Sequence, residues 1–348
     1  MTRVGYFGTW ERGYPRNEQV ISCLRGAGAT VEEIHEEVWS NEHKFALGAR
    51  LLPRLAAAEL RLARRRVTSD VVLVGYPGQF DLWAAKRTGK PVAFNAMLSL
   101  HETLVDDRNR FSPGSMPSRA LAAVDRLAFR AADLLVADTA ANASAMAEFA
   151  GLEHVEHVFV GAEERLFQPS WQPPERFVAL FVGKLIPLHG LETILAAARL
   201  VPEITFRIVG SGQQAALLHE LPRNVEHLPW VDYSELPREY ARAGCALGIF
   251  GTSRKVERVI PNKAFQALAV GTPLVTADTP AARELLQHGD NALLIDRSAE
   301  ALAAAVELLA RDRALAARIA ASGRATFERA ASEAVLGRRW LGLLRSLE

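Results

Sequence analysis

Short apolar runs and amphipathic helical stretches alternate along this chain in two successive rounds. The strands predicted for the first round are residues 4–7, 31–34, 71–74, 92–94, 134–137 and 155–160. The helices predicted between them are residues 18–27, 46–66, 117–131 and 142–149. Such alternation is typical of a parallel sheet covered by helices on both faces.

A polar, proline-bearing stretch at 168–176 separates the two rounds, and we interpret it as a linker. The strands predicted after it are residues 178–182, 205–209, 225–228, 246–250, 274–276 and 292–295. The predicted helices are residues 190–200, 213–221, 234–242, 262–270, 280–286 and 300–309. From residue 314 to 347 we expect a largely helical tail, interrupted at most near Gly323 and Gly337.

The length of 348 residues suits two domains. We therefore predict an α/β protein with two tandem Rossmann-like domains that face a central cleft, with ligands bound at the carboxyl ends of the strands. The expected boundaries are 1–167 for the first domain, 168–176 for the linker, 177–325 for the second domain and 326–348 for a final helix.

Composition and charge exclude several classes of protein. A hydrophobic fraction of 49% and a charged fraction of 23% indicate a soluble globular chain. The net charge of +1 argues against a nucleic-acid binder. Cys23 and Cys245 are far apart and belong to no Cys/His cluster, which favours a reducing compartment without structural zinc. The sequence has no run of eighteen apolar residues and begins like a strand rather than a signal peptide, so we expect a cytoplasmic protein.

Two loops of the second half carry the chemistry. Residues 181–192 and 259–275 each contain Gly or Pro and a cation before a predicted helix. A helix start offers unpaired N–H groups and the positive end of the dipole, so each loop suits an anion. Two such loops favour a ligand with a diphosphate. The alternative is a pair of ordinary loop-to-helix connections.

The ordered set of segments from about residue 130 to 325 resembles the retaining family-4 enzymes of the GT-B glycosyltransferases. The matching segments are Gly183-Lys184-Leu185 with His189 and Gly190, Val209-Gly210-Ser211-Gly212, residues 225–231, Tyr240-Ala241-Arg242-Ala243-Gly244, and residues 266–274. The resemblance implies sugar transfer from a nucleoside-diphosphate sugar to a sugar, lipid-linked or small-molecule acceptor, with retention, without a cofactor and without a metal.

The resemblance also implies a set of site residues. The donor-binding residues it points to are Gly8, Lys184, His189, Gly210, Val231, Arg258, Asn262, Lys263 and Gln266. The catalytic residues it points to are His101, Lys184 and Glu257. A solvated lysine and a packing histidine are the alternatives for Lys184 and His101.

Two positions depart from the family pattern. The family has a Glu-x7-Glu pair, and this chain has Arg258 and Gln266 there. A glutamine amide oxygen still accepts a hydrogen bond from a ribose hydroxyl. Arg258 cannot replace a carboxylate at the sugar, whereas the adjacent Glu257 carries one.

The loop at 9–17 suits a sugar or an acceptor phosphate through Trp10, Arg12, Tyr14 and Arg16. Its alternative is an ordinary surface loop. The arginine-rich helix expected at 49–66 suits peripheral contact with the inner face of a membrane, although a solvated helix has the same composition.

The tail carries one apolar stripe, which consists of Leu336, Trp340, Leu343 and Leu344. Because the final helix of GT-B enzymes commonly crosses back, we expect Trp340 to bury against the first domain. Two other functions stay open: a catalytically inactive nucleotide-binding partner protein and a sugar-nucleotide epimerase. A dehydrogenase is disfavoured because Gly-x-Gly-x-x-Gly is absent after the first strand.

Overall fold

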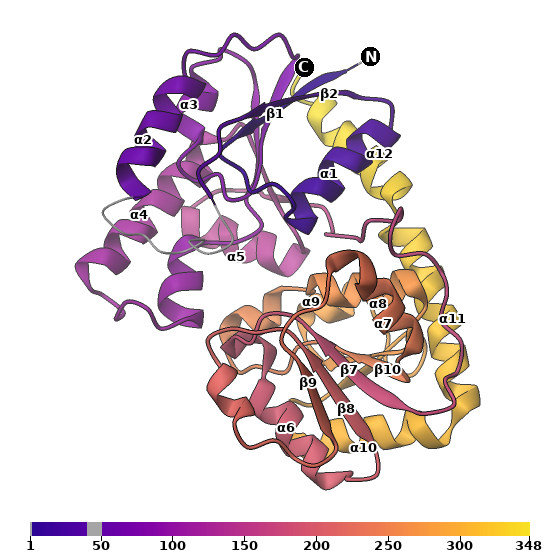
Figure 1. Cartoon of the computed structure of the whole chain (residues 1–348). Helices are drawn as coiled ribbons and strands as arrows, with labels where there is room; N and C mark the ends of the chain where they lie inside the picture. Colours follow the sequence, from indigo (N-terminus) through magenta and orange to yellow (C-terminus); the bar gives the residue numbers. More distant parts are fainter. Residues whose placement is uncertain (1, 40–50) are drawn as a thin grey trace. The chain divides into compact units, whose positions relative to one another are not determined.

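The computed structural model describes residues 2–39 and 51–348 of the chain. Two compact units account for it, Met1–Val160 with Glu333–Glu348 and Gly161–Ser332 (Figure 1). Each unit is built around its own parallel six-stranded sheet, so the predicted α/β class with two Rossmann-like domains is confirmed. The expected linker at 168–176 lies in the second unit, where Trp171 donates a 2.7 Å hydrogen bond to the carbonyl oxygen of Ala243.

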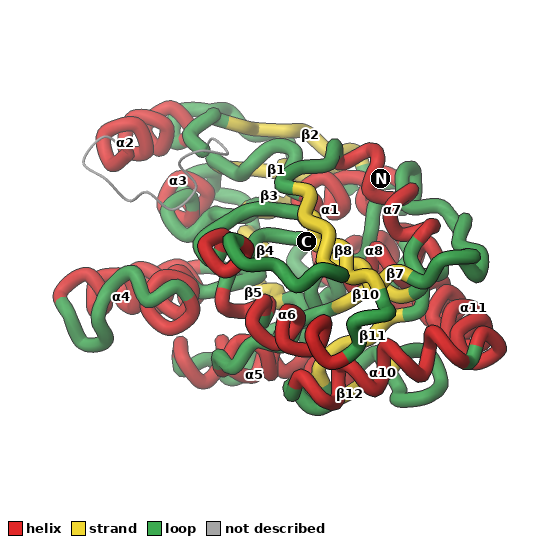
Figure 2. The backbone as a smooth tube through the Cα atoms, turned by 60° about the horizontal axis from the view of Figure 1, so that its bottom comes forward, coloured by secondary structure: helices red, strands yellow, loops and turns green. Residues whose placement is uncertain are grey.

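The sheet of the first unit has the order β2-β1-β3-β4-β5-β6. Its strands are β1 (Arg3–Gly8), β2 (Thr30–His35), β3 (Val71–Val74), β4 (Val92–Asn95), β5 (Leu134–Ala137) and β6 (Glu156–His157). Its helices are α1 (Pro15–Gly26), α2 (Leu51–Leu62), α3 (Leu82–Lys86), the π-helix η1 (Glu102–Asp107), α4 (Met116–Ala131), α5 (Ala140–Ala150) and α12 (Glu333–Arg345). Strands and helices alternate along the backbone tube as the sequence pattern predicts (Figure 2).

Both faces of this sheet are buried, because successive strand residues point to opposite sides. Val72 and Val74 of β3 belong to one apolar cluster, and Val71 and Leu73 of the same strand belong to the other. The second cluster also contains residues of α1 and α12. The continuous apolar sequence of β3 is therefore a consequence of its burial on both faces.

Helix α12 completes the core of the first unit. It lies beside α1, so that the two ends of the sequence meet (Figure 1). Trp340 is fully buried among residues of β1, β3 and α1. The guanidinium of Arg16 lies 5.4 Å from the centroid of the Trp340 ring. The tail helix therefore fills a face of the first sheet that would otherwise be exposed.

The sheet of the second unit has the order β12-β11-β10-β7-β8-β9. Its strands are β7 (Val178–Val182), β8 (Thr205–Val209), β9 (Val225–Leu228), β10 (Cys245–Leu247), β11 (Leu274–Ala277) and β12 (Leu293–Ile295). Its α-helices are α6 (Leu191–Leu200), α7 (Leu236–Arg242), α8 (Asn262–Val270), α9 (Pro280–Arg283), α10 (Ala299–Arg311) and α11 (Arg313–Ala330). Short 3-10 turns are η2 (Pro187–His189), η3 (Ala215–Leu218), η4 (Tyr233–Glu235) and η5 (Arg254–Arg258).

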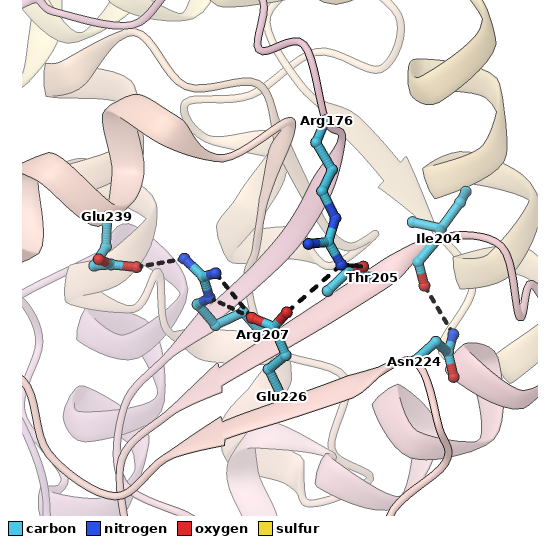
Figure 3. Close-up of polar contacts among 7 residues, drawn as sticks. All are labelled: Arg176, Ile204, Thr205, Arg207, Asn224, Glu226 and Glu239. Atoms are coloured by element: carbon cyan, nitrogen blue, oxygen red, sulfur yellow. Dashed lines mark hydrogen bonds and ion pairs between the residues drawn. The ribbon is translucent and has the colours of Figure 1, made fainter.

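A polar network ties the outer strands of this sheet together (Figure 3). The Arg207 guanidinium of β8 donates from Nη2 to Glu226 of β9 at 2.8 Å and from Nη1 to Glu239 of α7 at 3.0 Å. Immediately before β9, the Asn224 side-chain amide donates to the carbonyl oxygen of Ile204 at 2.8 Å. These bonds hold β9 against β8 and bring α7 over the same edge.

The tail breaks at a different place from the one expected. Helices α11 and α12 are separated at Ala331–Ser332, whereas Gly323 and Gly337 lie inside them. The reason is close packing: a Cβ at Gly323 would lie 2.9 Å from Leu268, and one at Gly337 would lie 2.2 Å from the carbonyl oxygen of Cys23. These glycines let neighbouring elements approach and do not end the helices.

Helix α2 is described from Leu51 onward, so the first residues of the segments expected at 46–66 and 49–66 lie outside the described residues. Arg61 and Arg65 both pair with Glu36, at 2.7 and 3.1 Å. Two of the arginines expected to contact a membrane therefore form ion pairs with a carboxylate of their own unit. Within the described ranges, every helix is too short or too polar to cross a membrane.

The two glycines of α12 provide a matched test of its packing. Gly337→Ala should destabilise the protein by roughly 1–3 kcal/mol, because the new methyl overlaps the α1 backbone. Gly342→Ala meets no described atom within 4 Å and should stabilise by about 0.5–1 kcal/mol through helix propensity. Urea unfolding measures both values, and equal effects at the two positions would contradict the packing of α12 on α1.

Candidate functional site

The strand order of the second unit places a switch point between β7 and β10. β8 and β9 lie on one side of β7, and β10, β11 and β12 lie on the other. In such sheets the crossovers on the two sides cover opposite faces, which leaves a crevice at the carboxyl ends of the two central strands. The loop after β7 and the loop before α8 meet at this edge, and they are the two loops in which Gly or Pro and a cation precede a helix.

Two glycine turns touch at the carboxyl ends of β7 and β8. Gly210 has a φ of +133°, and a Cβ at this position would lie 2.0 Å from the carbonyl oxygen of Gly183. The Gly183 N–H donates to the carbonyl oxygen of Val209 at 2.9 Å. Only a residue without a side chain permits this backbone contact. The turn at Gly183 is therefore held in place by its neighbour.

Lys263 is the most unusual side chain at this turn. It is the second residue of α8, only 6% exposed, and its Nζ lies 3.6 Å from the centroid of the Phe181 ring. Within the described part of the chain, Nζ has no hydrogen-bond partner. Burial lowers the pKa of Lys263 well below its ordinary value. A Cβ at Gly183 would lie 3.0 Å from Nζ, so the amine points at the glycine turn.

His189 approaches the same turn from η2. Its ring packs edge-on against Phe181 with 5.5 Å between centroids, and its Cε1 would lie 3.2 Å from a Cβ at Gly183. Its Nδ1 bonds to the carbonyl oxygen of Lys184, and since a carbonyl only accepts, Nδ1 carries a proton. Lys184 itself is exposed. Two nitrogenous side chains therefore gather around Gly183, with Lys184 on the outer side.

Gln266 lies one turn further along α8. Its Oε1 accepts a 3.1 Å hydrogen bond from the Tyr240 hydroxyl, and its Nε2 donates to the Tyr233 hydroxyl at 3.3 Å. Burial first, and then the nearby Glu163 carboxylate, raise the pKa of Tyr233. The amide expected to meet a ribose is thus oriented by two tyrosines. Tyr233 and Glu163 were not selected from the sequence, because nothing in their local pattern marks them.

The remaining expected site residues of the second unit lie in η5, at the start of α8 and in the loop before η4. Glu257 of η5 pairs with Arg297 at 2.8 Å, so its carboxylate already has a cationic partner. Arg258 ends η5 and Asn262 begins α8, and both are half-buried. Val231 is half-buried in the loop between β9 and η4.

In the first unit, the turn after β1 is held by a buried carboxylate. Gly8 has a φ of +123°, and a Cβ there would lie 2.1 Å from Asp81 Oδ2. Asp81 accepts from the Thr9 N–H at 2.7 Å and from the Thr9 hydroxyl at 2.9 Å. Burial raises the pKa of Asp81, and burial together with the Asp81 carboxyl raises the pKa of Glu59. Asp81 stands at the N-cap position of α3, but its carboxylate accepts hydrogen bonds from Thr9 and does not cap the helix.

The four residues expected to bind an acceptor do not gather on one surface. Trp10 is 1% exposed and packs edge-on against Tyr6, with ring centroids 5.1 Å apart. Arg16 is fully buried and donates to Asn95 and to the carbonyl oxygens of residues 158 and 159. Arg12 is exposed, and the Tyr14 ring is tilted against the Tyr76 ring with 4.8 Å between their centroids. Trp10 and Arg16 are therefore part of the core.

His101 stands immediately before η1, near the carboxyl end of β4. Its backbone N–H donates to Asp125 at 2.8 Å, and its Nε2 lies 3.1 Å from the Ser118 hydroxyl. Its ring stacks against Phe149, and its Nδ1 lies 3.9 Å from Asp106. The side chain is about a quarter exposed, which leaves it accessible to a ligand.

Part of the second unit is similar to known proteins. Residues 176–312 match the family described as "Glycosyl transferases group 1". The lipopolysaccharide core biosynthesis glycosyltransferase LpsE of Rhizobium meliloti (strain 1021) is 25% identical over 175 residues. That match covers 50% of this chain and 51% of the relative, so it spans about half the length of each.

Solved structures resemble the chain over its whole length. A sucrose-phosphate synthase from Thermosynechococcus elongatus has a TM-score of 0.78 and 16% identity, covering 100% of this chain and 99% of that one. Anabaena HepE in complex with UDP-glucose has a TM-score of 0.72 and 17% identity, covering 100% of both chains. At these identities the likeness shows the fold, which is the GT-B fold.

The burial of the Lys263 amine predicts how its replacement changes the free energy of unfolding. Lys263→Met should raise the free energy of unfolding of the empty protein by roughly 1–3 kcal/mol, because it replaces an unsatisfied buried polar group by an apolar one. At pH values between the lowered pKa of folded Lys263 and the ordinary lysine pKa, the Lys263 amine is protonated in the unfolded chain and neutral in the folded protein. The free energy of unfolding of the wild type should therefore rise with pH in this range.

Urea unfolding at several pH values measures this effect. The Lys263→Met variant should lack that part of the rise with pH. Lys90→Met in the first unit is a suitable control and should leave both the stability and its pH dependence nearly unchanged. A loss of stability in Lys263→Met would contradict the absence of a partner for Nζ among the described residues.

Proposed function

Because residues 176–312 match the glycosyl transferases group 1 family, we propose that this chain is a glycosyltransferase. It moves a sugar, of the hexose type, from a nucleoside-diphosphate sugar to an acceptor hydroxyl. The observation that carries the proposal is the buried amine of Lys263, aimed at the Gly183 turn without a partner among the described residues. A buried amine holds a proton readily only beside an anion, and a diphosphate supplies one.

The proposed donor site follows α8 from its first residues toward Gln266. The diphosphate contacts Lys263, His189 and the start of α8, where the helix dipole adds positive potential. The nucleoside extends toward Gln266 and Tyr233, with Val231 near the base. Anabaena HepE has been solved with UDP-glucose, and this supports a uridine nucleotide as the first donor to test.

We propose that transfer proceeds with retention and without a metal. Cleavage of the glycosidic bond leaves additional negative charge on the diphosphate, and Lys184, Lys263 and His189 stabilise that charge. Attack on the same face, assisted by the leaving diphosphate, needs no carboxylate nucleophile, unlike the paired carboxylates of glycosidases. In this proposal Glu257 contacts the donor sugar, and His101 is a further catalytic residue.

One observation favours a second function. Arg258 stands where the family has a carboxylate, and Glu257 is already paired with Arg297. Those features suit a protein that binds the nucleotide and supports a partner without transfer. Turnover separates the two functions, because a binding protein releases no free nucleoside diphosphate from the donor.

Thermal-shift measurements with UDP, GDP, ADP and dTDP test nucleotide binding, and release of the free diphosphate from the matching sugar donors tests transfer. Stabilisation by one diphosphate together with release of that diphosphate supports the enzyme. Stabilisation without release supports the binding protein. An absence of any stabilisation contradicts both.

Lys263→Met should weaken UDP binding by at least about tenfold, because a charge-assisted hydrogen bond contributes about 1.5–3 kcal/mol. Binding of uridine, which carries no phosphate, should change little. Lys90→Met is the control for general effects of removing a lysine charge. Calorimetric titration measures all four affinities, and an equal loss for UDP and uridine would argue for a damaged fold instead of a lost phosphate contact.

His101→Ala should reduce turnover while affinity for UDP stays near the wild-type value, because His101 belongs to the first unit and the nucleotide site to the second. Ser118→Ala removes the hydroxyl near His101 Nε2 and keeps the ring, so it should retain more activity. Full turnover in His101→Ala would leave His101 with a packing role only.

A further inference from the structure

The amine of Lys263 is in surroundings that oppose its protonation. It is 6% exposed, it lies over the Phe181 ring, and it sits in the first turn of α8, where the helix dipole is positive. Burial alone accounts for the lowering of its pKa. The ring face offers a weak attraction for a cation, far less than a carboxylate provides.

Among the described residues, the elements around α8 place no counter-charge beside Nζ of Lys263. In α7, Tyr240 bonds to Gln266 and Glu239 pairs with Arg207. In α11, Arg324 pairs with Glu328. Strand β10 contributes a buried thiol, Cys245, whereas β7 and β11 contain no titratable residue.

His189 of η2 is the titratable group that shares the Gly183 turn with Lys263. It is a second nitrogen base, not an anion, so it cannot hold the lysine in its charged form. Lys184, on the outer side of the turn, is also a base. Because the described residues offer no anion beside Nζ, an anionic ligand is needed to stabilise a proton on Lys263.

We propose that binding of a nucleoside diphosphate at the Gly183 turn is coupled to the uptake of one proton by Lys263. This inference rests on the proposed function and adds a proton to its binding step. The amine takes the proton from water or buffer, and the resulting ammonium ion pairs with a diphosphate oxygen. The ligand and the proton each favour binding of the other, as linkage requires.

The sign of the pH dependence follows from this coupling. The complex holds one proton more than the free protein between the low pKa of the free amine and the raised pKa in the complex. Affinity should therefore fall as pH rises through this window, by up to about tenfold per pH unit. A neutral nucleoside lacks the charge that stabilises the ammonium, so uridine should bind without uptake.

The coupling also distinguishes the donor from the product. Transfer of the sugar leaves a free diphosphate with more negative charge than the sugar donor carried. Protonation of Lys263 should then be more complete with UDP than with UDP-glucose. The positive charge on Lys263 thus increases as the negative charge on the leaving diphosphate increases. Without a ligand the amine is neutral, so the empty site contains no buried cation.

Isothermal titration calorimetry at pH 8.5 tests the inference with UDP and uridine as probes. The same titration is made in several buffers that differ in ionisation enthalpy, and the slope of the observed enthalpy against that quantity counts the protons taken up. At this pH an unperturbed histidine and a terminal phosphate have already lost their protons, since their pKa values are about 6 to 6.5. We expect about one proton for UDP, and about zero for uridine.

Variants assign the proton to a residue. Lys263→Arg keeps a permanent cation, so it should bind UDP with an uptake near zero. Lys263→Met fits the apolar surroundings and should also lose the uptake, with weaker binding. His189→Gln should retain the uptake, because it leaves Lys263 in place.

The outcomes separate the two proposals. UDP binding without proton uptake in the wild type overturns the coupling and leaves the proposed function standing. Uptake that persists in both Lys263 variants, or that disappears in His189→Gln alone, assigns the proton elsewhere and also overturns it. A failure of the wild type to bind any nucleoside diphosphate removes the proposed function and the coupling together.

Discussion

All strands of both sheets run parallel to their neighbours, and this constraint decides where the polar groups of the protein lie. Each connection between parallel strands returns the chain to the edge where the strands begin. The carboxyl ends of all strands of a sheet therefore lie together at the other edge. Loops at that edge lead into the following helices. In the second unit, they bring Gly183, His189 and the start of α8 together although the residues are up to 80 positions apart in sequence.

Each unit buries an ionisable side chain at the turn after one of its central strands. In the second unit it is Lys263 beside Gly183, and in the first unit it is Asp81 beneath Gly8 and Thr9. The two differ in their partners, because Asp81 accepts hydrogen bonds from Thr9, whereas Nζ of Lys263 lies on an aromatic ring. Buried polar groups without partners cost stability, and such costs are typical of sites that bind ligands.

Local patterns predicted the elements better than the side-chain roles. Alternating apolar runs indicated the strands of both sheets, because a strand buried on both faces must be apolar throughout. The same reasoning could not place Trp10 and Arg16, which look like ligand-binding residues in a polar loop but are buried against Tyr6 and Asn95. It also mistook Gly323 for a helix break, since a contact with Leu268 is invisible in the local sequence.

The amino-acid sequence by itself determined the two rounds of strands and helices and the two loops that carry Gly or Pro and a cation before a helix, because periodicity and backbone preferences are local. Only the tertiary structure decided which cation is buried. Lys184 and Lys263 look equivalent in sequence, yet the first is exposed and the second is enclosed by Phe181 and the Gly183 turn. Desolvation depends on neighbours from distant strands, and so the pKa of a lysine is a property of the fold and not of its motif.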